Sequence, residues 1–301
     1  MRILVTGAAG YIGSALARSL GSQPVLATDQ SEPRFGTPVV GNLAYPPFAR
    51  SLITRDSELV FHLAALVSGG AEQNFELGMK VNFDATRDLL EACRLARHAP
   101  KFIFASSIAV YGGALPDPVT DETAPAPRLS YGAQKLACEI LIDDYTRRGY
   151  IDGRSLRIPT VMVRPGSANT AASGWASAIV REALAGRDYV CPVRPDTKMA
   201  CISLRRVVEA FLHAAELPAE RLGSERSVVL SGIGITAQEM WDAVKAKARG
   251  RVRFEPDPRL QELMDRMPKA TFSQRAQSLG FRASANIDEI VAEYEQAEAH
   301  A

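Results

Sequence analysis

The chain has few cysteines and almost no net charge. Only four of its 301 residues are cysteines, and no two of them stand at the spacing of a CxxC zinc or redox site. We therefore expect no metal site and no disulfide framework, but buried thiols in the reducing cytoplasm. The 35 basic and 34 acidic side chains nearly cancel, so the charge gives no sign of binding to nucleic acid or to an anionic membrane surface.

Long hydrophobic runs are absent as well. No apolar run approaches the roughly 20 residues that span a bilayer. The chain reaches a glycine turn at Gly7, which is too early for the apolar core of a signal peptide. Hydrophobic residues nevertheless make up 47% of the composition and charged residues 23%, as in ordinary globular proteins. These features predict a cytoplasmic protein with a large buried core.

Short apolar runs alternate with helical patterns over the first half of the chain. The runs predict strands over Arg2–Thr6, Val25–Thr28, Val39–Val40, Leu59–Leu63, Lys101–Ala105 and Ser155–Val163. Apolar residues at helical spacing predict helices over Tyr11–Leu20, Met79–Arg97 and Tyr131–Arg147. Apolar strands separated by helices are typical of a parallel sheet that is covered on both faces. We therefore predict an α/β fold with a Rossmann-type, doubly wound parallel sheet.

The alternation becomes irregular near Pro165. We expect a nucleotide-binding domain over residues 1–165 and a smaller, mixed α/β substrate lobe over residues 166–301, with segments near 200–232 returning to the first domain.

Local signals mark further elements of both regions. Val207–Glu216 has a helical pattern, and Val228–Leu230 is expected to rejoin the sheet. A capping box at Thr236–Glu239 and the pair Asn286 and Glu289 predict the starts of two helices. Gly112–Ser130 is rich in proline and acidic residues, and it is predicted to be a surface loop.

Three glycines follow the first strand at the spacing of a dinucleotide-binding turn. Gly7 allows the tight turn, Gly10 lets the backbone approach a pyrophosphate, and Gly13 lets the helix pack closely. The helix amino terminus then offers N–H groups and a partial positive charge to the phosphates. The alternative is a glycine turn with a purely structural role.

Asp29 indicates which dinucleotide binds. It ends the second predicted strand, 22 residues after Gly7, where an acidic residue accepts hydrogen bonds from the adenosine ribose and repels a 2′-phosphate. The sequence therefore predicts NAD rather than NADP as the cofactor, unless Asp29 is only an exposed acid in a turn.

Tyr131 and Lys135 lie four residues apart on one face of a predicted helix. A tyrosine is a poor base at neutral pH, and a nearby lysine cation favours the tyrosinate. Ser107 ends a predicted strand 24 residues upstream, at the sheet edge where ligands bind, and its hydroxyl can hold a substrate oxygen beside the tyrosine. We expect these three residues to be catalytic, although a Tyr–Lys pair alone is common on solvated helices. His62 is expected to be a packed strand residue rather than a catalyst.

The order of these motifs resembles a known family. The glycine turn, His62–Ala65, Asn82, Ser106–Gly112 and Tyr131–Lys135 together resemble the extended short-chain dehydrogenase/reductase superfamily, the NAD-dependent epimerase/dehydratase group. The resemblance covers nearly the whole chain. It implies that Tyr131 is the acid/base, that Lys135 binds the nicotinamide ribose, and that Ser107 completes the triad.

The resemblance also implies a set of NAD contacts and a homodimer. The contacts fall on Gly7, Gly10, Tyr11, Ile12, Gly13, Asp29, Asn42, Leu43, Leu63, Ala64, Ala65, Asn82, Tyr131, Lys135, Pro159, Thr160 and Val161. In relatives, the helices that correspond to Asp84–Arg97 and Tyr131–Arg147 pair across a two-fold axis.

Departures from the family narrow the reaction. Ile108 and Ala109 stand where the sugar-nucleotide 4,6-dehydratases carry an Asp-Glu pair, which excludes dehydration. The chain is shorter than most nucleotide-sugar epimerases, which favours a small polar substrate. Further stretches resemble the D-erythronate dehydrogenases, namely Ala64–Gly69, Asp117–Asp121, Asp143–Gly149, Arg157–Gly166 and Phe254–Pro258. This resemblance implies NAD-dependent oxidation of a small sugar acid at C2 to the 2-oxo acid.

A sugar acid needs a partner for its carboxylate, ideally a bidentate arginine. The substrate-binding candidates are Ser68, Gly69, Ser107, Tyr131, Asn169 and Ser173, with Lys198 and Arg181 as further candidates for the carboxylate. Two other hypotheses stay open. One is a nucleotide-sugar epimerase that retains its NAD, and the other is a dinucleotide-sensing regulator without catalysis, against which the intact triad argues.

Overall fold

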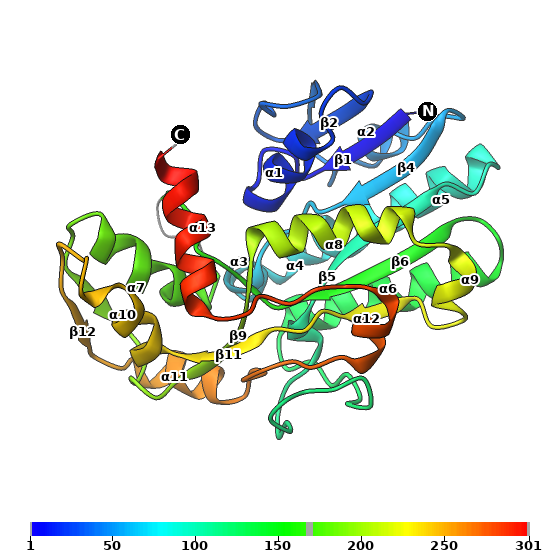
Figure 1. Ribbon diagram of the computed structural model, residues 1–301. Helices are drawn as coiled ribbons and strands as arrows, with labels where there is room; N and C mark the ends of the chain where they lie inside the picture. Colours follow the sequence, from blue (N-terminus) through cyan, green and yellow to red (C-terminus); the bar gives the residue numbers. More distant parts are fainter. Residues whose placement is uncertain (1, 167–170, 300–301) are drawn as a thin grey trace. The chain divides into compact units, whose positions relative to one another are not determined.

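The computed structural model describes residues 2–166 and 171–299 (Figure 1). The chain folds into two compact units. Unit 1 comprises Met1–Val110, Leu129–Arg157 and Val208–Val228. Unit 2 comprises Tyr111–Arg128, Ile158–Val207 and Val229–Ala301. Neither unit is a continuous stretch of chain.

Unit 1 is built on a seven-stranded sheet in the order β10-β6-β5-β4-β1-β2-β3. Its strands are β1 (Arg2–Thr6), β2 (Val25–Asp29), β3 (Thr37–Val40), β4 (Ser57–His62), β5 (Lys101–Ser107), β6 (Asp152–Ile158) and β10 (Ser227–Val229). Strand β1 lies inside the sheet and pairs in parallel with both β2 and β4. Strand order therefore reverses between β1 and β4, the place where open α/β sheets bind their ligands. The predicted doubly wound sheet is confirmed. Of the stretch Val228–Leu230 that was predicted to return to it, Val228 and Val229 lie in β10, and Leu230 follows the strand.

Helices separate these strands along the chain. They are α1 (Tyr11–Ser19), α2 (Pro46–Ser51), α3 (Ser68–Gln73), α4 (Phe75–Gly78), η1 (Met79–Asp84), α5 (Ala85–Ala96), η2 (Ile108–Val110), α6 (Ser130–Arg147), α8 (Leu204–Glu216) and α9 (Ala219–Leu222). One core cluster brings Leu89 and Leu90 of α5 together with Phe102 and Phe104 of β5 and Ile142 of α6. Burial of these apolar side chains against one another holds α5 and α6 to the sheet.

Two predicted elements differ from the structure. Met79–Arg97 does not form one regular α-helix, because Met79–Asp84 is a π-helix that leads into α5. Apolar periodicity does not register the extra residue of a π-turn, which is often found at functional sites. Ser155–Val163 does not form one strand, because Pro159 separates β6 from β7 (Thr160–Met162), and the two belong to different sheets. A proline has no N–H to donate to a sheet ladder.

Unit 2 has two small sheets, in the orders β11-β9-β7 and β12-β8. The strands are β8 (Tyr189–Cys191), β9 (Lys198–Ser203), β11 (Ile233–Thr236) and β12 (Val252–Phe254), with β7 as given above. The helices are α7 (Gly174–Leu184), α10 (Ala237–Lys245), α11 (Pro258–Asp265), α12 (Gln274–Leu279) and α13 (Ile287–Ala299). Their shared core includes Trp175, Ile179, Met240, Val244 and Ile290. The capping box that was predicted to open a helix at Thr236 is present.

The proline-rich loop, residues 111–128, is tied to the far end of the sequence within unit 2. Val119 N donates to Ala270 O at 3.0 Å, and Phe272 N donates to Val119 O at 2.8 Å. The carboxylate of Asp121 accepts from Ser273 Oγ at 2.6 Å and from Arg275 N at 3.0 Å, so it helps to fix the start of α12. The loop is therefore an ordered part of unit 2.

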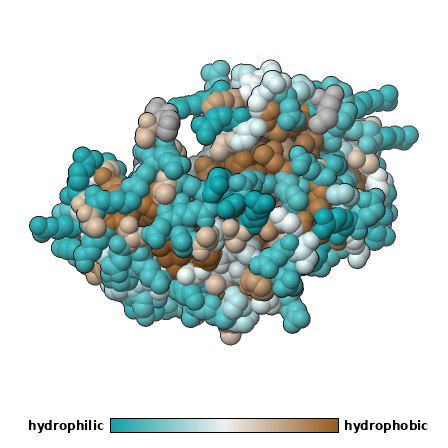
Figure 2. Space-filling model, in the orientation of Figure 1, coloured by the Kyte–Doolittle hydropathy of each residue, from teal (hydrophilic) through white to brown (hydrophobic). Residues whose placement is uncertain are grey.

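The surface is that of an ordinary polar protein. Hydrophilic residues cover most of the face seen in Figure 2, and apolar residues show in separate patches. All four cysteines are buried and free, as expected. Within residues 2–166 and 171–299, we find no helix that is both long enough and apolar enough to cross a membrane.

Candidate active site

The glycine turn between β1 and α1 is as tight as its sequence predicts. Gly7 has a φ of +70°, and a Cβ at this position would lie 2.7 Å from Ala64 N. A Cβ on Gly13 would lie 2.1 Å from Gly7 O, so the first turn of α1 packs directly on the turn backbone. Gly10 is the N-cap of α1, and no described side chain caps that helix. Tyr11 and Ile12 belong to the first turn of α1, whose free N–H groups are able to bind an anion.

Asp29 lies at this turn, at the carboxyl end of β2. Its carboxylate accepts from Ala9 N at 3.0 Å and from Gln30 N at 2.7 Å, which fixes its position beside the glycine turn. A carboxylate has about four lone-pair sites, so acceptor capacity for ribose hydroxyls remains. Asn42 accepts from Ala44 N at 2.9 Å, and the neighbouring Leu43 is buried.

His62 is a structural residue at the end of β4. It is fully buried, and burial lowers its pKa to about 3. Thr6 Oγ1 accepts from Ala64 N, so its hydroxyl donates to His62 Nδ1 at 2.7 Å. Thr86 donates to Asn82 O, so His62 Nε2–H donates to Thr86 Oγ1 at 2.9 Å. Every polar atom of the neutral ring therefore has a partner, which leaves no role for it as an acid or base.

Asn82 holds the turn that follows β4. Its Oδ1 accepts from Leu66 N at 2.7 Å, and its Nδ2 donates to Leu66 O at 3.0 Å and to Gln134 Oε1 at 2.7 Å. Both amide hydrogens are thus committed within the protein. The structure places Asn82 as a support for the backbone beside the half-buried Leu63, Ala64 and Ala65.

Gln134, between Tyr131 and Lys135 on α6, was missed by the sequence analysis. Its side chain is 3% exposed, and its Nε2 is a buried donor without a partner in the described part of the chain. A Cβ on Gly78 would lie only 2.9 Å from this atom. Through its Oε1, which accepts from Asn82 Nδ2, Gln134 joins α6 to the π-helix.

The hydroxyls of Ser107 and Tyr131 are neighbours, close enough for Ser107 to affect the ionisation of the tyrosine. Ser107 Oγ, at the end of β5, accepts from Ala109 N at 3.1 Å. Burial raises the pKa of Tyr131 to about 12, and the hydrogen bond from Ser107 acts in the opposite direction because it favours the ionised form. In this structure the phenol is therefore protonated at neutral pH.

Lys135 is a deeply buried cation of unit 1. It is 1% exposed, and its Nζ lies 4.5 Å from the ring centroid of Phe104 and 5.6 Å from that of Tyr131. Its ammonium makes no hydrogen bond or ion pair with any residue in 2–166 and 171–299. Burial lowers its pKa to about 8, whereas Cys138 and Glu139 raise it.

These features fit a bound dinucleotide. The glycine turn forms a cradle that a Cβ would fill, Asp29 lies beside it, and the buried ammonium of Lys135 lacks the acceptors that ribose hydroxyls provide. The predicted triad residues therefore lie in one unit, with Ser107 against Tyr131 and with Lys135 below the tyrosine ring.

The other predicted contacts are spread over both units. Ser68 and Gly69 are half-buried at the start of α3 in unit 1. Pro159 lies between β6 and β7, and the half-buried Thr160 and Val161 belong to β7 in unit 2. Ser173 is the N-cap of α7, but its side chain makes no capping hydrogen bond within the described residues. Asn169 lies outside the described residues.

The two further candidates for a carboxylate partner already have partners within unit 2. Arg181 is 5% exposed, donates to Arg164 O at 2.9 Å and pairs with Glu182 at 2.7 Å. Lys198 pairs with Asp117 at 3.0 Å. Both cations are therefore already paired with a carboxylate of the protein.

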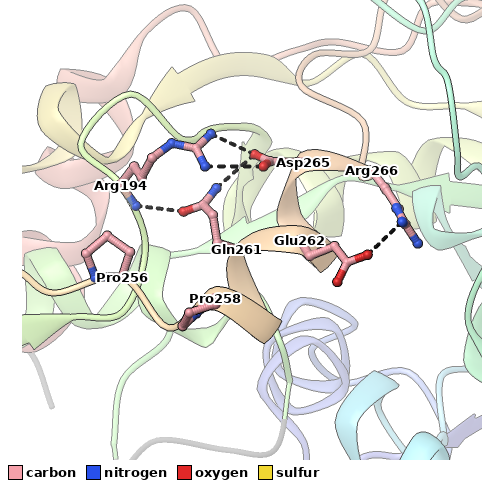
Figure 3. A pocket seen from close by; sticks show the side chains of 7 residues that line it. All are labelled: Arg194, Pro256, Pro258, Gln261, Glu262, Asp265 and Arg266. Carbon is pink, nitrogen blue, oxygen red and sulfur yellow. Dashed lines mark hydrogen bonds and ion pairs between the residues drawn. The ribbon is translucent and has the colours of Figure 1, made fainter.

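A pocket of unit 2 offers no alternative site. Its volume is about 460 Å³, and Figure 3 shows its lining of Arg194, Pro256, Pro258, Gln261, Glu262, Asp265 and Arg266. Arg194 makes a two-pronged pair with Asp265, at 2.9 and 3.2 Å, and Arg266 pairs with Glu262 at 2.7 Å. The charges of this pocket therefore neutralise one another.

Comparison with known proteins identifies the family. The model of the NAD dependent epimerase/dehydratase family matches residues 3–229. The chain belongs to this family. Together with its similarity to two curated dehydrogenases, described next, this membership makes the protein an NAD-dependent oxidoreductase.

Several family members are similar over their whole length. The chain is 43% identical to a D-erythronate dehydrogenase of Cupriavidus necator and 37% identical to one of Haemophilus influenzae, in each case over 98% of both chains. Among solved structures, a nucleoside-diphosphate-sugar epimerase from Agrobacterium tumefaciens superimposes with a TM-score of 0.94 at 34% identity, over 100% of this chain and 95% of that one.

Proposed function

We propose that this family member oxidises a small sugar acid of the D-erythronate type at C2 and transfers the hydride to NAD, which gives the 2-oxo acid. The full-length identity of 43% with a D-erythronate dehydrogenase carries this proposal. The arrangement of Ser107, Tyr131 and Lys135 supports it, because it offers a hydroxyl donor, a phenol and a buried cation to one substrate oxygen and one ribose.

In the proposed reaction, each residue of the triad has one task. Ser107 holds the substrate hydroxyl, and Tyr131 takes its proton. Lys135 donates hydrogen bonds to the hydroxyls of the nicotinamide ribose. These hydroxyls supply the acceptors that its ammonium lacks. NAD, when bound, supplies the hydride acceptor at C4 of its nicotinamide. Since the pKa of Tyr131 is raised to about 12 in the protein alone, the tyrosinate depends on positive charge near the phenol.

The proposed cofactor contacts follow the geometry of the fold. Gly7, Gly10 and Gly13 admit the pyrophosphate at α1, and Asp29 accepts from the adenosine ribose. Asn42 and Leu43 lie beside the adenine. The turn after β4, Leu63–Ala65, lies along the cofactor, and Asn82 supports that turn. Pro159–Val161 are proposed to contact the nicotinamide, and Ser68, Gly69 and Ser173 the substrate.

The test is NADH formation by the purified protein with NAD and a panel of four- to six-carbon sugar acids, led by D-erythronate and L-threonate, with UDP-sugars alongside. We expect turnover of a sugar acid, and we expect Tyr131→Phe to lower kcat by about 10²- to 10⁴-fold. Tyr145→Phe is the matched control, since Tyr145 lies on the same helix and its hydroxyl donates to Glu91. This variant should keep its activity.

The similarity to a nucleoside-diphosphate-sugar epimerase gives the second candidate function. Conversion of a UDP-sugar without net NADH, by protein that is purified with tightly bound NAD, would replace the dehydrogenase proposal with this one. Binding of NAD without turnover of any compound would leave a dinucleotide sensor.

A homodimer is proposed to form through α5 and α6. Leu95 on α5 and Ile140 on α6 are apolar and each 63% exposed, and the two helices pack side by side. Exposed apolar side chains on adjacent helices suit a second copy of the same surface. Sedimentation equilibrium should give twice the chain mass, and Leu95→Glu with Ile140→Glu should give the monomer.

A further inference from the structure

Glu139 lies one helical turn beyond Lys135 on α6, and its carboxylate is almost wholly buried, at 2% exposure. Arg157 of β6 donates to both of its oxygens, through Nε at 3.1 and 3.2 Å and through Nη2 at 2.7 Å. Ser227 Oγ of β10 donates to it at 3.2 Å. Ser106 Oγ, near the end of β5, donates to Oε1. One carboxylate thus binds one guanidinium and two hydroxyls.

We call these four side chains, Ser106, Glu139, Arg157 and Ser227, the Glu139 clamp. The clamp joins α6 to three adjacent strands, β5, β6 and β10. It ends next to the candidate triad on both sides, because Ser106 directly precedes Ser107 and because Glu139 shares α6 with Tyr131 and Lys135. The strand end that carries Ser107 and the helix that carries Tyr131 are therefore joined at this point.

Stability alone does not account for the clamp. Replacing a buried ion pair by apolar side chains of similar size is often neutral or stabilising, because taking two charges out of water is costly. A buried pair is better suited to hold a specific geometry, since the five hydrogen bonds to Glu139 fix the distances between the elements that carry them.

We propose that Glu139 is a positioning residue, which fixes the Ser107 hydroxyl against Tyr131 and places a negative charge one helical turn from Lys135. The proposal rests on the proposed function, in which Tyr131 takes a proton and Lys135 binds the ribose. Glu139 and Ser106 are both buried and bonded to each other, so they act through the neighbouring residues that they hold.

The charges around Lys135 support the second part of the proposal. The titratable groups that act on it or lie against it are Tyr131, Cys138 and Glu139 on α6 and His62 on β4. Tyr131 and Cys138 are protonated at neutral pH, since burial raises the pKa of each, to about 12 and about 11. His62 is neutral. Among these groups, Glu139 therefore carries the negative charge that opposes the loss of the Lys135 proton.

The test uses Glu139→Gln, which keeps the size of the side chain and removes its charge. We expect kcat for the sugar acid to fall roughly 10- to 100-fold with KM nearly unchanged, because the reacting groups are misplaced while the substrate still binds. We also measure NAD affinity by calorimetry as a function of pH, and we call the pH above which the affinity falls its alkaline limit. This limit should move down by about one pH unit in the variant, because Lys135 loses its proton more easily. The second measurement needs no turnover.

Two further variants separate position from charge. Ser106→Ala removes the bond to the strand end but leaves the pair between Glu139 and Arg157, so kcat should fall while the alkaline limit stays in place. Asp144→Asn removes an exposed carboxylate of the same helix, which pairs with Arg147 at the surface. This control should change neither quantity, and melting temperatures show that each variant is folded.

The outcomes decide each part. Unchanged kcat in folded Ser106→Ala overturns the positioning role, also in the case that Glu139→Gln does not fold. An alkaline limit that stays in place in folded Glu139→Gln overturns the role of the charge. If the unaltered protein oxidises no sugar acid, the proposed function fails, yet the affinity measurement still gives its result for Glu139.

Discussion

His62 should make the stability of the protein depend on pH well above the range of acid denaturation. The ring is fully buried and neutral between Thr6 and Thr86, and its pKa is lowered from 6.5 to about 3. In the unfolded chain the ring takes up a proton below its ordinary pKa, whereas the folded protein cannot accept that proton. The contribution of His62 to stability is therefore complete above the unfolded pKa of 6.5 and is lost as the pH falls towards 3.

The size of this loss follows from the two pKa values. Each pH unit within the window costs about 1.4 kcal/mol, so the free energy of unfolding should fall by about 2 kcal/mol between about pH 7.5 and about pH 5. Asp143, whose pKa is raised to about 6, acts in the opposite direction over part of this range. The effect of His62 must therefore be measured as a difference between two proteins that share Asp143.

The comparison is with His62→Gln, whose amide is neutral at every pH and still offers an acceptor and a donor. Urea unfolding is followed by far-UV circular dichroism at both pH values. The variant will be less stable at neutral pH, but its loss of stability on acidification should be about 2 kcal/mol smaller than that of the unaltered protein. If both proteins lose the same amount, His62 is not held neutral and the hydrogen-bond directions given above are wrong.

Three further predictions concern the cofactor site. Gly13→Ala would place a Cβ 2.1 Å from Gly7 O, so it should abolish measurable NAD binding in a calorimetric titration; binding at the original affinity would show that the turn can yield. Asn82→Ala strands both backbone polar groups of Leu66 and should cost about 1–3 kcal/mol in urea unfolding together with weaker NAD binding, whereas an unchanged midpoint would contradict the support that we assign to it. Asp29→Ala should narrow the preference for NAD over NADP by about tenfold or more in competition titrations, since the repelling charge is gone, and an unaltered preference would locate the discrimination elsewhere.

The strands and the glycine turn could be predicted because their signals are local. A buried parallel strand is a short apolar run, and Gly7 and Gly13 stand where only a residue without a side chain fits. The capping box at Thr236 is a local signal of the same kind. Asp29 was predicted beside the turn from its place at the end of a strand, and the hydrogen bond from Ala9 N now shows it there.

The supporting residues could not be predicted, because their roles depend on contacts between distant segments. Gln134 meets Asn82 across 52 positions, and Ser227 meets Glu139 across 88. Of these residues, Glu139 alone had a local signal in the sequence. It stands four residues after Lys135, on the helix face that was already assigned to the site. The π-helix at Met79–Asp84 is equally invisible to periodicity.

The interleaving of the two units along the chain has a consequence for synthesis on the ribosome. The chain passes from one unit to the other five times, after residues 110, 128, 157, 207 and 228. When β6 has just emerged, its neighbour β10 has not yet been translated, so the growing sheet presents a bare edge at β6. Arg157 and Glu139 then lack the hydroxyl of Ser227 until some 70 further residues have been added. At a translation rate of roughly 5–20 residues per second, this unfinished edge is exposed for several seconds, and during that time the nascent protein is open to a chaperone or to a wrong strand.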